Sequence, residues 1–213
     1  PQYANTTFTT DPTQAQQILT SAGYTKGSDG IFAKGGKKLS FTLEVTAGYT
    51  DWISDCQIMV QNLKAVGMDV KLTQVQDEFP DLQNGTFDAA IFYGTPGPSP
   101  YYIYYQVLDS VNTAPIGQAA STNFERWSDP TTDKLLAQFD GTTDLATQQQ
   151  AMYGIEQILI QQLPVIFLMN EPYWYEYNTL KYTGWPDQGN LYAEGSPYNY
   201  PDDEIIVLNL KSV

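Results

Sequence analysis

The sequence predicts an α/β fold, a mixed-sheet layered sandwich in which helices cover a sheet. Strand-like and helical segments alternate through the first hundred residues, and such alternation is typical of layered α/β proteins. In these folds, ligands usually bind beside the loops at the carboxyl ends of the strands. The length of 213 residues and the hydrophobic content of 42% are sufficient for a sizeable core.

The amino-terminal part predicts a helix, a strand and a second helix. Asp11 and Pro12 are typical of a helix start, and apolar residues then recur at helical spacing over residues 12–22. Apolar and polar residues alternate over 39–46, which predicts a half-buried strand. A 3.6-residue period predicts a helix over 51–66, for which Thr50 and Asp51 are candidate N-caps.

The following segments extend this alternation. Residues 68–75 predict a strand and 77–83 a weak helix, and 87–93 predict a buried strand that ends in a loop rich in glycine and proline. Two more helices are expected over 129–139 and 146–162, and a buried strand over 165–169. The segments 39–46, 68–75, 87–93 and 165–169 are predicted to share one sheet. Residues 184–201 have no period and are expected to form ordered coil.

Composition excludes several functions. Lysine and arginine total 10 against 24 aspartates and glutamates, a net charge of −14 that would repel nucleic acid. The absence of histidine removes the usual base of serine and cysteine hydrolases and the commonest transition-metal ligand, so no catalytic residue, metal or cofactor is predicted. The single cysteine, Cys56, is expected to be a small buried apolar residue.

Several short motifs, in this order, resemble the carboxy-terminal lobe of the large ABC-transporter solute-binding proteins of the peptide, nickel and oligosaccharide class. They are Ala22-Gly23-Tyr24 with Asp29-Gly30-Ile31, Gly67-Met68-Asp69-Val70, Phe87-Asp88, Arg126-Trp127-Ser128-Asp129-Pro130 and Leu163-Pro164-Val165-Ile166-Phe167-Leu168. The resemblance implies one lobe of a two-lobed, periplasmic-binding-protein-like (type II) fold.

The resemblance also implies an organisation and a location. Whole members are more than twice as long, so residues 1–178 would form the carboxy-terminal ligand-binding lobe and residues 179–213 a tail that returns to an absent amino-terminal lobe. The whole protein would capture a solute between its lobes and deliver it to an ABC permease in the membrane. It would be extracellular or periplasmic, and a lipoprotein anchored through the absent amino terminus.

The loop after residues 87–93 bears on the ligand. The resemblance implies an acidic residue there in peptide-binding members, whereas residues 94–100 contain no carboxylate. A desolvated peptide amine would lose its charge partner at this place. Aromatic faces and uncharged donors suit sugars, and the chain has 16 tyrosines and 4 tryptophans. An oligosaccharide is therefore the expected ligand, with an oligopeptide as the alternative.

The candidate ligand-binding residues are aromatic or uncharged polar residues, together with one arginine. They are Tyr49, Trp52, Tyr93, Ser99, Tyr101, Tyr102, Asn123 and Arg126.

Other roles remain open for some of these residues. Trp52 could anchor its helix to the sheet, and Arg126 could close a local ion pair with Glu125 or Asp129. Two further function classes also remain open. One is a carbohydrate-active enzyme using two of Glu156, Glu171 and Glu176, and the other is an aromatic-rich interaction module.

Overall fold

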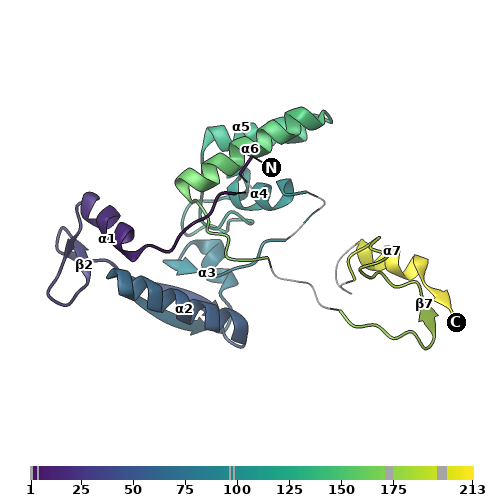
Figure 1. Ribbon diagram of the computed structural model, residues 1–213, viewed down its shortest axis with the longest axis horizontal. Coiled ribbons are helices and arrows are strands. Elements are labelled where there is room, and N and C mark those ends of the chain that lie inside the picture. Colours follow the sequence, from purple (N-terminus) through teal and green to yellow (C-terminus); the bar gives the residue numbers. More distant parts are fainter. Residues whose placement is uncertain (1, 4, 96, 98, 171–174, 196–200) are drawn as a thin grey trace. The chain divides into compact units, whose positions relative to one another are not determined.

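The computed structural model describes residues 2–3, 5–95, 97, 99–170, 175–195 and 201–213. The chain divides into two compact units, Pro1–Ile166 and Phe167–Val213 (Figure 1). The boundary expected after residue 178 lies inside the second unit. The first unit has parallel and antiparallel sheets and layered helices, which confirms the predicted α/β class.

A parallel sheet with strand order β5-β4-β6 forms the centre of the first unit. Strand β4 (Ser40–Thr46) pairs in register with β5 (Asp69–Val75), and the crossover between them is α2 (Thr50–Val66). The helix ends where Gly67 adopts φ 106°, a left-handed conformation that glycine accommodates readily. Leu43, Val45, Cys56, Val60 and Val70 are buried between helix and sheet, and this burial confirms the expectation for Cys56.

The third strand is shorter than predicted. Strand β6 comprises only Ala89–Ala90, which pair with Leu43 and Glu44, although 87–93 were expected to be strand. One cause is visible at Thr42, whose backbone N–H donates to the Asp88 carboxylate at 2.9 Å. A side chain therefore takes the donor that a longer β6 would have used.

A small antiparallel sheet adjoins the amino-terminal helix. Helix α1 (Pro12–Ser21) begins as predicted, because the Asp11 carboxylate accepts from the Gln14 N–H at 2.9 Å. Strands β1 (Thr25–Lys26), β2 (Phe32–Lys34) and β3 (Lys37–Lys38) follow and pair in order.

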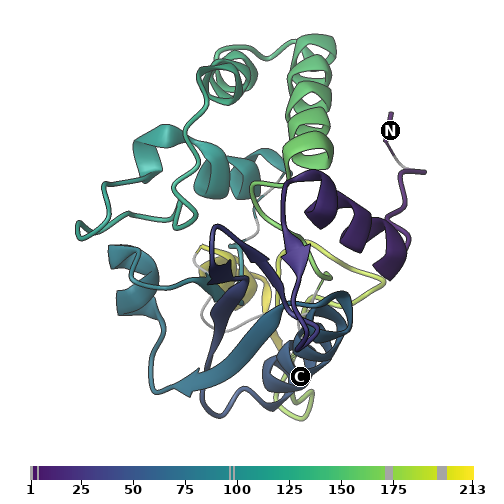
Figure 2. The same ribbon diagram turned by 90° about the vertical axis from the view of Figure 1, so that its left-hand side faces the viewer.

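The rest of the first unit is helical. Helix α4 (Tyr101–Leu108), the short η1 (Ser110–Asn112), α5 (Pro130–Asp140) and α6 (Leu145–Gln162) group apart from the parallel sheet (Figure 2). Their core contains Leu108, Leu136, Met152, Ile155 and Leu159. Helices α5 and α6 match the predicted segments, whereas α4 was not predicted. Its Tyr-Tyr-Ile-Tyr-Tyr sequence is rich in residues that favour strands, but its position after the Pro100 turn permits a helix.

The strand predicted over residues 165–169 is wrong. Residues 165–169 form neither helix nor strand, and Ile166, Phe167, Leu168 and Met169 are exposed. The apolar run favoured a buried strand, but it has no neighbouring strand with which to pair among the described residues. Three of the four predicted sheet segments therefore share the sheet, and this one does not.

Helix α3 (Phe79–Asn84) lies between β5 and β6 in the chain. Its Leu82 is buried with Ala120 and Phe124, and Phe87, Ala90 and Phe92 pack against them. This third cluster joins α3 and the residues around β6 to the loop before α5.

The second unit contains one helix and one pair of short strands in its described part. Strands β7 (Tyr182–Thr183) and β8 (Lys211–Ser212) pair antiparallel, and α7 (Asp202–Asn209) buries Ile206. Trp185 stacks on Tyr177 with ring centroids 5.5 Å apart. Across all described residues, no helix combines the length and apolar character needed to cross a membrane.

Candidate ligand-binding site

Six aromatic side chains form a continuous series of ring contacts, which we call the aromatic ridge. They are Tyr49, Trp52, Tyr93, Phe92, Phe79 and Phe124. The centroids of Tyr49 and Trp52 lie 5.0 Å apart, those of Trp52 and Tyr93 6.3 Å, and those of Tyr93 and Phe92 4.5 Å. These separations lie in the range of favourable aromatic pairs.

The parallel sheet brings these rings together. Tyr49 follows β4, Phe79 follows β5, and Phe92 and Tyr93 follow β6, so all four come from the carboxyl ends of parallel strands. The turn from β4 into α2 passes through Gly48 at φ 96°, which reverses the chain before Tyr49. The ridge therefore occupies the edge of the sheet where the sequence predicted a ligand.

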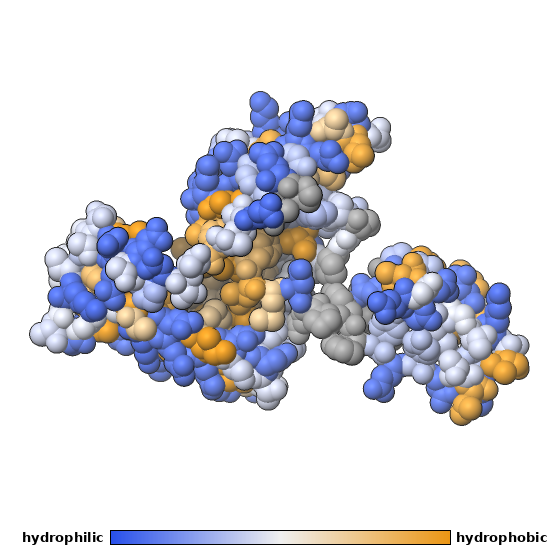
Figure 3. Space-filling view, viewed as in Figure 1, coloured by the Kyte–Doolittle hydropathy of each residue, from blue (hydrophilic) through white to orange (hydrophobic). Residues whose placement is uncertain are grey.

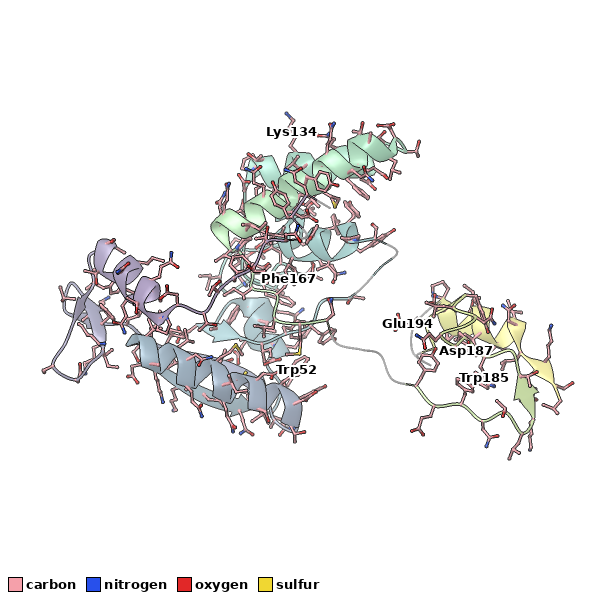
Figure 4. The ribbon with its side chains drawn as sticks, in the orientation of Figure 1. Trp52, Lys134, Phe167, Trp185, Asp187 and Glu194 are labelled. Carbon is pink, nitrogen blue, oxygen red and sulfur yellow. The ribbon has the colours of Figure 1, made fainter. Side chains whose placement is uncertain are left out.

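The ridge combines exposed rings with anchored ones. Tyr93 is 61% exposed, Tyr49 52% and Phe79 40%, whereas Phe124 is buried. Trp52 is half-buried and packs against the core under α2, so it both anchors the helix and joins the ridge. Figure 4 shows Trp52 at the end of α2 that lies farther from β2. In Figure 3, apolar side chains gather between α2 and the helices α4 to α6.

Helix α2 starts without a side-chain cap. The N-cap position is Tyr49, with no capping hydrogen bond from its side chain, and Thr50 is already the first helical residue. The predicted N-cap role of Thr50 or Asp51 is therefore wrong. This arrangement leaves the Tyr49 ring available to stack on Trp52.

The tyrosines of α4 have different surroundings. Tyr101 stacks on Phe139 at a centroid distance of 4.7 Å and an interplanar angle of 7°, and it packs against the helical core. That contact makes Tyr101 a packing residue. Tyr102 is 45% exposed and meets the Tyr101 ring edge at 5.6 Å, and Ser99 is half-buried in the preceding loop.

Asn123 was expected to bind ligand, but it is completely buried and its amide is used within the protein. Its Nδ2 donates to the carbonyls of Asp109 and Trp127 at 3.1 and 2.8 Å, and its Oδ1 accepts from the Trp127 N–H at 2.9 Å. Because these bonds hold the chain before α5, Asn123 is a structural residue and the prediction of a ligand contact is wrong.

The Arg126 guanidinium is hydrogen-bonded within the protein. Its guanidinium donates to the carbonyls of Leu82, Gln83 and Phe124 at 3.3, 2.7 and 2.6 Å. Two of these carbonyls belong to the last turn of α3, where a positive charge is favourable. Arg126 therefore caps α3 instead of pairing with Glu125 or Asp129.

Three carboxyl groups around the ridge carry unpartnered buried oxygens. They belong to Glu44, Glu78 and Glu125. Burial raises the pKa of Glu78 to about 7, and the charge of Glu44 adds to the effect. Burial also raises the pKa of Glu125 to about 7, and it raises the pKa of Glu44. Among the described residues, no group of three or more potential ligands could hold a metal ion.

The candidate glycosidase carboxylates come from different parts of the chain. Glu156 lies on α6 in the first unit, Glu176 belongs to the second unit, and Glu171 lies outside the described residues.

Sequence reasoning missed the phenylalanines of the ridge. Phe79, Phe92 and Phe124 were not candidates, because an apolar phenylalanine near a strand is usually a core residue. The available signal was position, since Phe79 and Phe92 follow predicted strands just as Tyr49 and Tyr93 do. Together, the layered fold and the open aromatic edge at the strand ends are typical of proteins that bind small solutes.

The comparisons with known proteins agree with this class. Residues 1–115 match the model of the bacterial extracellular solute-binding proteins, family 5 Middle. The chain therefore belongs to the family 5 solute-binding proteins, whose members are extracellular or periplasmic binding proteins that work with ABC importers. No curated protein sequence matches the chain.

Solved structures resemble the fold. A periplasmic oligopeptide-binding protein of an ABC transporter from Thermotoga maritima, solved with bound mannohexaose, matches with a TM-score of 0.81 and 24% identity over 99% of this chain and 40% of its own. NikZ from Campylobacter jejuni, in complex with Ni(L-His), matches with a TM-score of 0.64 and 23% identity over 72% and 31%. AppA from Bacillus subtilis, in complex with a nonapeptide, matches with a TM-score of 0.61 and 24% identity over 71% and 30%.

These likenesses show the fold, which is that of periplasmic binding proteins of type II. The family and these neighbours are binding proteins. The chain spans less than half of the length of each of the three structures.

Proposed function

We propose that this chain is the carboxy-terminal lobe and tail of a solute-binding protein that captures an oligosaccharide for an ABC permease. Residues 1–178 would form the ligand-binding lobe, and residues 179–213 would return to an amino-terminal lobe of the same protein. The whole protein would act outside the cytoplasm, anchored as a lipoprotein through its amino terminus, and would bind its ligand without catalysing a reaction.

The aromatic ridge carries the proposal. Tyr49, Trp52 and Tyr93 combine exposed ring faces with polar tips, which suits the C–H faces and hydroxyl groups of sugar rings. Because these rings contact one another in succession, they present several ring faces side by side. Such an arrangement suits a ligand made of several sugar residues. Ser99 and Tyr102 are the further proposed contacts, because they lie in and just after the loop that follows Tyr93.

The ligand is proposed to be neutral because of the charges around the ridge. Residues 94–100 supply no carboxylate for a peptide amine, and one carboxyl oxygen each of Glu44 and Glu78 is buried. The bound mannohexaose of the Thermotoga maritima protein supports a sugar ligand, whereas the nonapeptide held by AppA supports the peptide alternative.

The second unit supports the proposed return to another lobe. Leu180, Leu191 and Leu208 are between 75 and 84% exposed in this short unit. Exposed leucines of this kind are stabilised when another part of the protein covers them. Capture would then work by closure, in which a ligand that contacts both lobes favours the closed state.

Calorimetry on the full-length protein tests the proposal. Cello- and manno-oligosaccharides would be titrated alongside a panel of short peptides, and we expect binding of at least one sugar series. Trp52→Ala should weaken that binding by about 1–3 kcal/mol, the range for loss of a well-packed aromatic contact. Tyr24→Ala is the matched control, because Tyr24 contacts Lys34 near β2 and makes no ring contact with the ridge. Tight peptide binding without any sugar binding would overturn the proposal.

A further inference from the structure

The small antiparallel sheet of β1, β2 and β3 gathers positive charge in an acidic chain. Residues 12–40 contain four lysines and one acidic residue, a net charge of +3, whereas the whole chain has a net charge of −14. The lysines are Lys26, Lys34, Lys37 and Lys38, and all four are exposed. Within the described residues, the only ion pair joins Lys38 to Asp29. The charges of the other three lysines are therefore not offset by an ion pair in this part of the chain.

These three lysines share one face of the small sheet. Lys26 lies opposite Phe32, and Lys34 lies opposite Lys37. Opposite residues of an antiparallel pair share a face, as do residues two apart on one strand. We call the three residues Lys26, Lys34 and Lys37 the lysine face. Two of its ammonium groups are held in place, because Lys26 Nζ lies 5.7 Å from the Phe32 ring centroid and Lys34 Nζ donates to the Ala22 carbonyl at 2.8 Å.

A tight hairpin turn presents two of these charges side by side. Gly35 and Gly36 have φ values of 59° and 77°, and two positive φ values are typical of the two-residue turn that joins antiparallel strands. Apart from chain neighbours, no atom lies within 4 Å of the point where a side chain would start at either glycine, so the tip is open. Like charges directly opposite each other destabilise a sheet. An anion near Lys34 and Lys37 would remove this repulsion.

The lysine face and the aromatic ridge lie at opposite edges of the parallel sheet. The Phe32 N–H donates to the Gly67 carbonyl at 2.8 Å, and the Asp69 N–H donates to the Leu39 carbonyl at 2.9 Å, so the small sheet is tied to the edge where β4 and β5 begin. The seven residues of β4 span about 20 Å. Figures 1 and 4 show β2 beyond one end of α2 and Trp52 at the other end. A partner on the lysine face would therefore leave the ridge open.

We propose that the lysine face binds the phosphate groups of an anionic lipid membrane. Lysine ammonium groups are compact point charges that pair with phosphate, and basic surfaces are attracted to anionic lipids. A protein partner fits less well, because the centres of protein interfaces are apolar and depleted in lysine, whereas Phe32 on this face is buried. The family works with ABC permeases, which lie in a membrane. At about 0.1 M salt, charges more than about 10 Å away are largely screened, so the acidic remainder of the chain does not prevent this attraction.

Cosedimentation of the whole chain with lipid vesicles tests the proposal. Vesicles that contain phosphatidylglycerol and phosphatidylcholine would be compared with vesicles of phosphatidylcholine alone, at about 0.1 M salt. We expect binding only to the vesicles that contain phosphatidylglycerol, and we expect it to weaken as the salt concentration rises. Lys26→Gln combined with Lys37→Gln should lower the partition coefficient on the order of 20-fold, because each lysine near an anionic surface contributes about fivefold. Equal binding to both kinds of vesicle, or to neither, would overturn the proposal.

A second double variant separates the lysine face from net charge. Lys134→Gln combined with Lys211→Gln is the matched control, because it removes the same charge from α5 and β8 and should leave vesicle binding nearly unchanged. Equal losses in the two double variants would mean that net charge drives binding, which would overturn the proposal. Lys34 is kept in both variants, because its bond to the Ala22 carbonyl supports the end of α1.

Stability distinguishes a docking role of Lys37 from a structural one. Lys37→Gln alone should leave the free energy of unfolding unchanged or raise it when no vesicles are present, because it removes the repulsion from Lys34. Urea unfolding measures this value. A clear loss of stability would assign Lys37 to support of the hairpin and would overturn its docking role.

Soluble polyphosphate distinguishes a membrane from a free polyanion. Binding of polyphosphate without binding of phosphatidylglycerol vesicles would overturn the membrane as the partner. The proposal does not rest on the proposed sugar ligand, and the vesicle experiment decides it even if no sugar binds. If mannohexaose binds and the vesicles do not, the proposed function stands and the role of the lysine face fails.

Discussion

The two aromatic regions of the first unit use similar residues in opposite ways. At the ends of the strands, Tyr49 and Tyr93 are more than half exposed and contact Trp52. In the helical part, Tyr101 lies flat on Phe139 and packs against the core of α4, α5 and α6. Both regions had the same sequence signal, namely tyrosines beside a turn.

The difference comes from what covers each ring. At the strand ends Tyr49 and Tyr93 stay more than half exposed, whereas Tyr101 is on a helix that packs against α5. An aromatic residue at a turn therefore indicates a binding surface only when the elements around the turn leave its face open.

The largest contrast is expected between Tyr101→Ala and Tyr49→Ala. Loss of the Tyr101 ring leaves a gap beside Phe139, so the free energy of unfolding should fall by about 3 kcal/mol. Tyr49→Ala should change it by less than about 1 kcal/mol, because that ring is 52% exposed. Urea unfolding measures both values. Equal losses would mean that the two regions do not differ in the way that their packing indicates.

Asn123→Ala should reduce the free energy of unfolding by about 2 kcal/mol. The substitution leaves the Trp127 N–H and two carbonyls without their partner in a buried place. Urea unfolding should show this loss. The loss should be smaller for Asn112→Ala, because the Asn112 amide donates to one carbonyl at a more exposed position. A variant of Asn123 with unchanged stability but weaker ligand binding would return this residue to the binding site.

Glu125→Gln should stabilise the protein at high pH. Burial raises the pKa of Glu125 to about 7, so its ionisation costs stability as the pH rises through 7. We expect a gain of roughly 1–2 kcal/mol at about pH 8, and little gain near pH 5, where the wild-type carboxyl is already protonated. Thermal unfolding at the two pH values measures the difference, and a gain that is independent of pH would contradict the assignment.

The smallest effect is expected at the start of α5. Hydrogen bonds from Thr132 outweigh the opposing effect of burial and lower the pKa of Asp129, which caps this helix. Asp129→Ala should cost about 1 kcal/mol near neutral pH. Because the folded pKa is lowered, this stability is present above the ordinary pKa of aspartate and is lost as the pH falls through the folded value. Urea unfolding should show a difference in the free energy of unfolding between the wild type and Asp129→Ala near neutral pH, and this difference should shrink in acid.

Local patterns predicted the elements that depend on their own residues. The period of α2 with Gly67 at its end, and the helix start at Asp11 and Pro12, are signals contained within a few residues. The error at 165–169 has the opposite origin, because an apolar run becomes a strand only when a partner strand is beside it.

The same distinction applies to the site. Tyr49, Trp52 and Tyr93 were predicted from their place after strands, and the structure brings them together. Asn123 and Arg126 were predicted from their chemistry alone, and that chemistry serves backbone groups that only the folded chain brings near. The sequence contains no local sign of those distant partners.

The bond between Asp88 and the Thr42 N–H also affects how the molecule meets other copies of itself. A strand with a free donor beside a two-residue neighbour is a place where a foreign strand can add and start a fibril. The Asp88 carboxylate occupies that donor at 2.9 Å and brings a negative charge to the opening. One aspartate thereby closes this donor of β4 to pairing with a foreign strand.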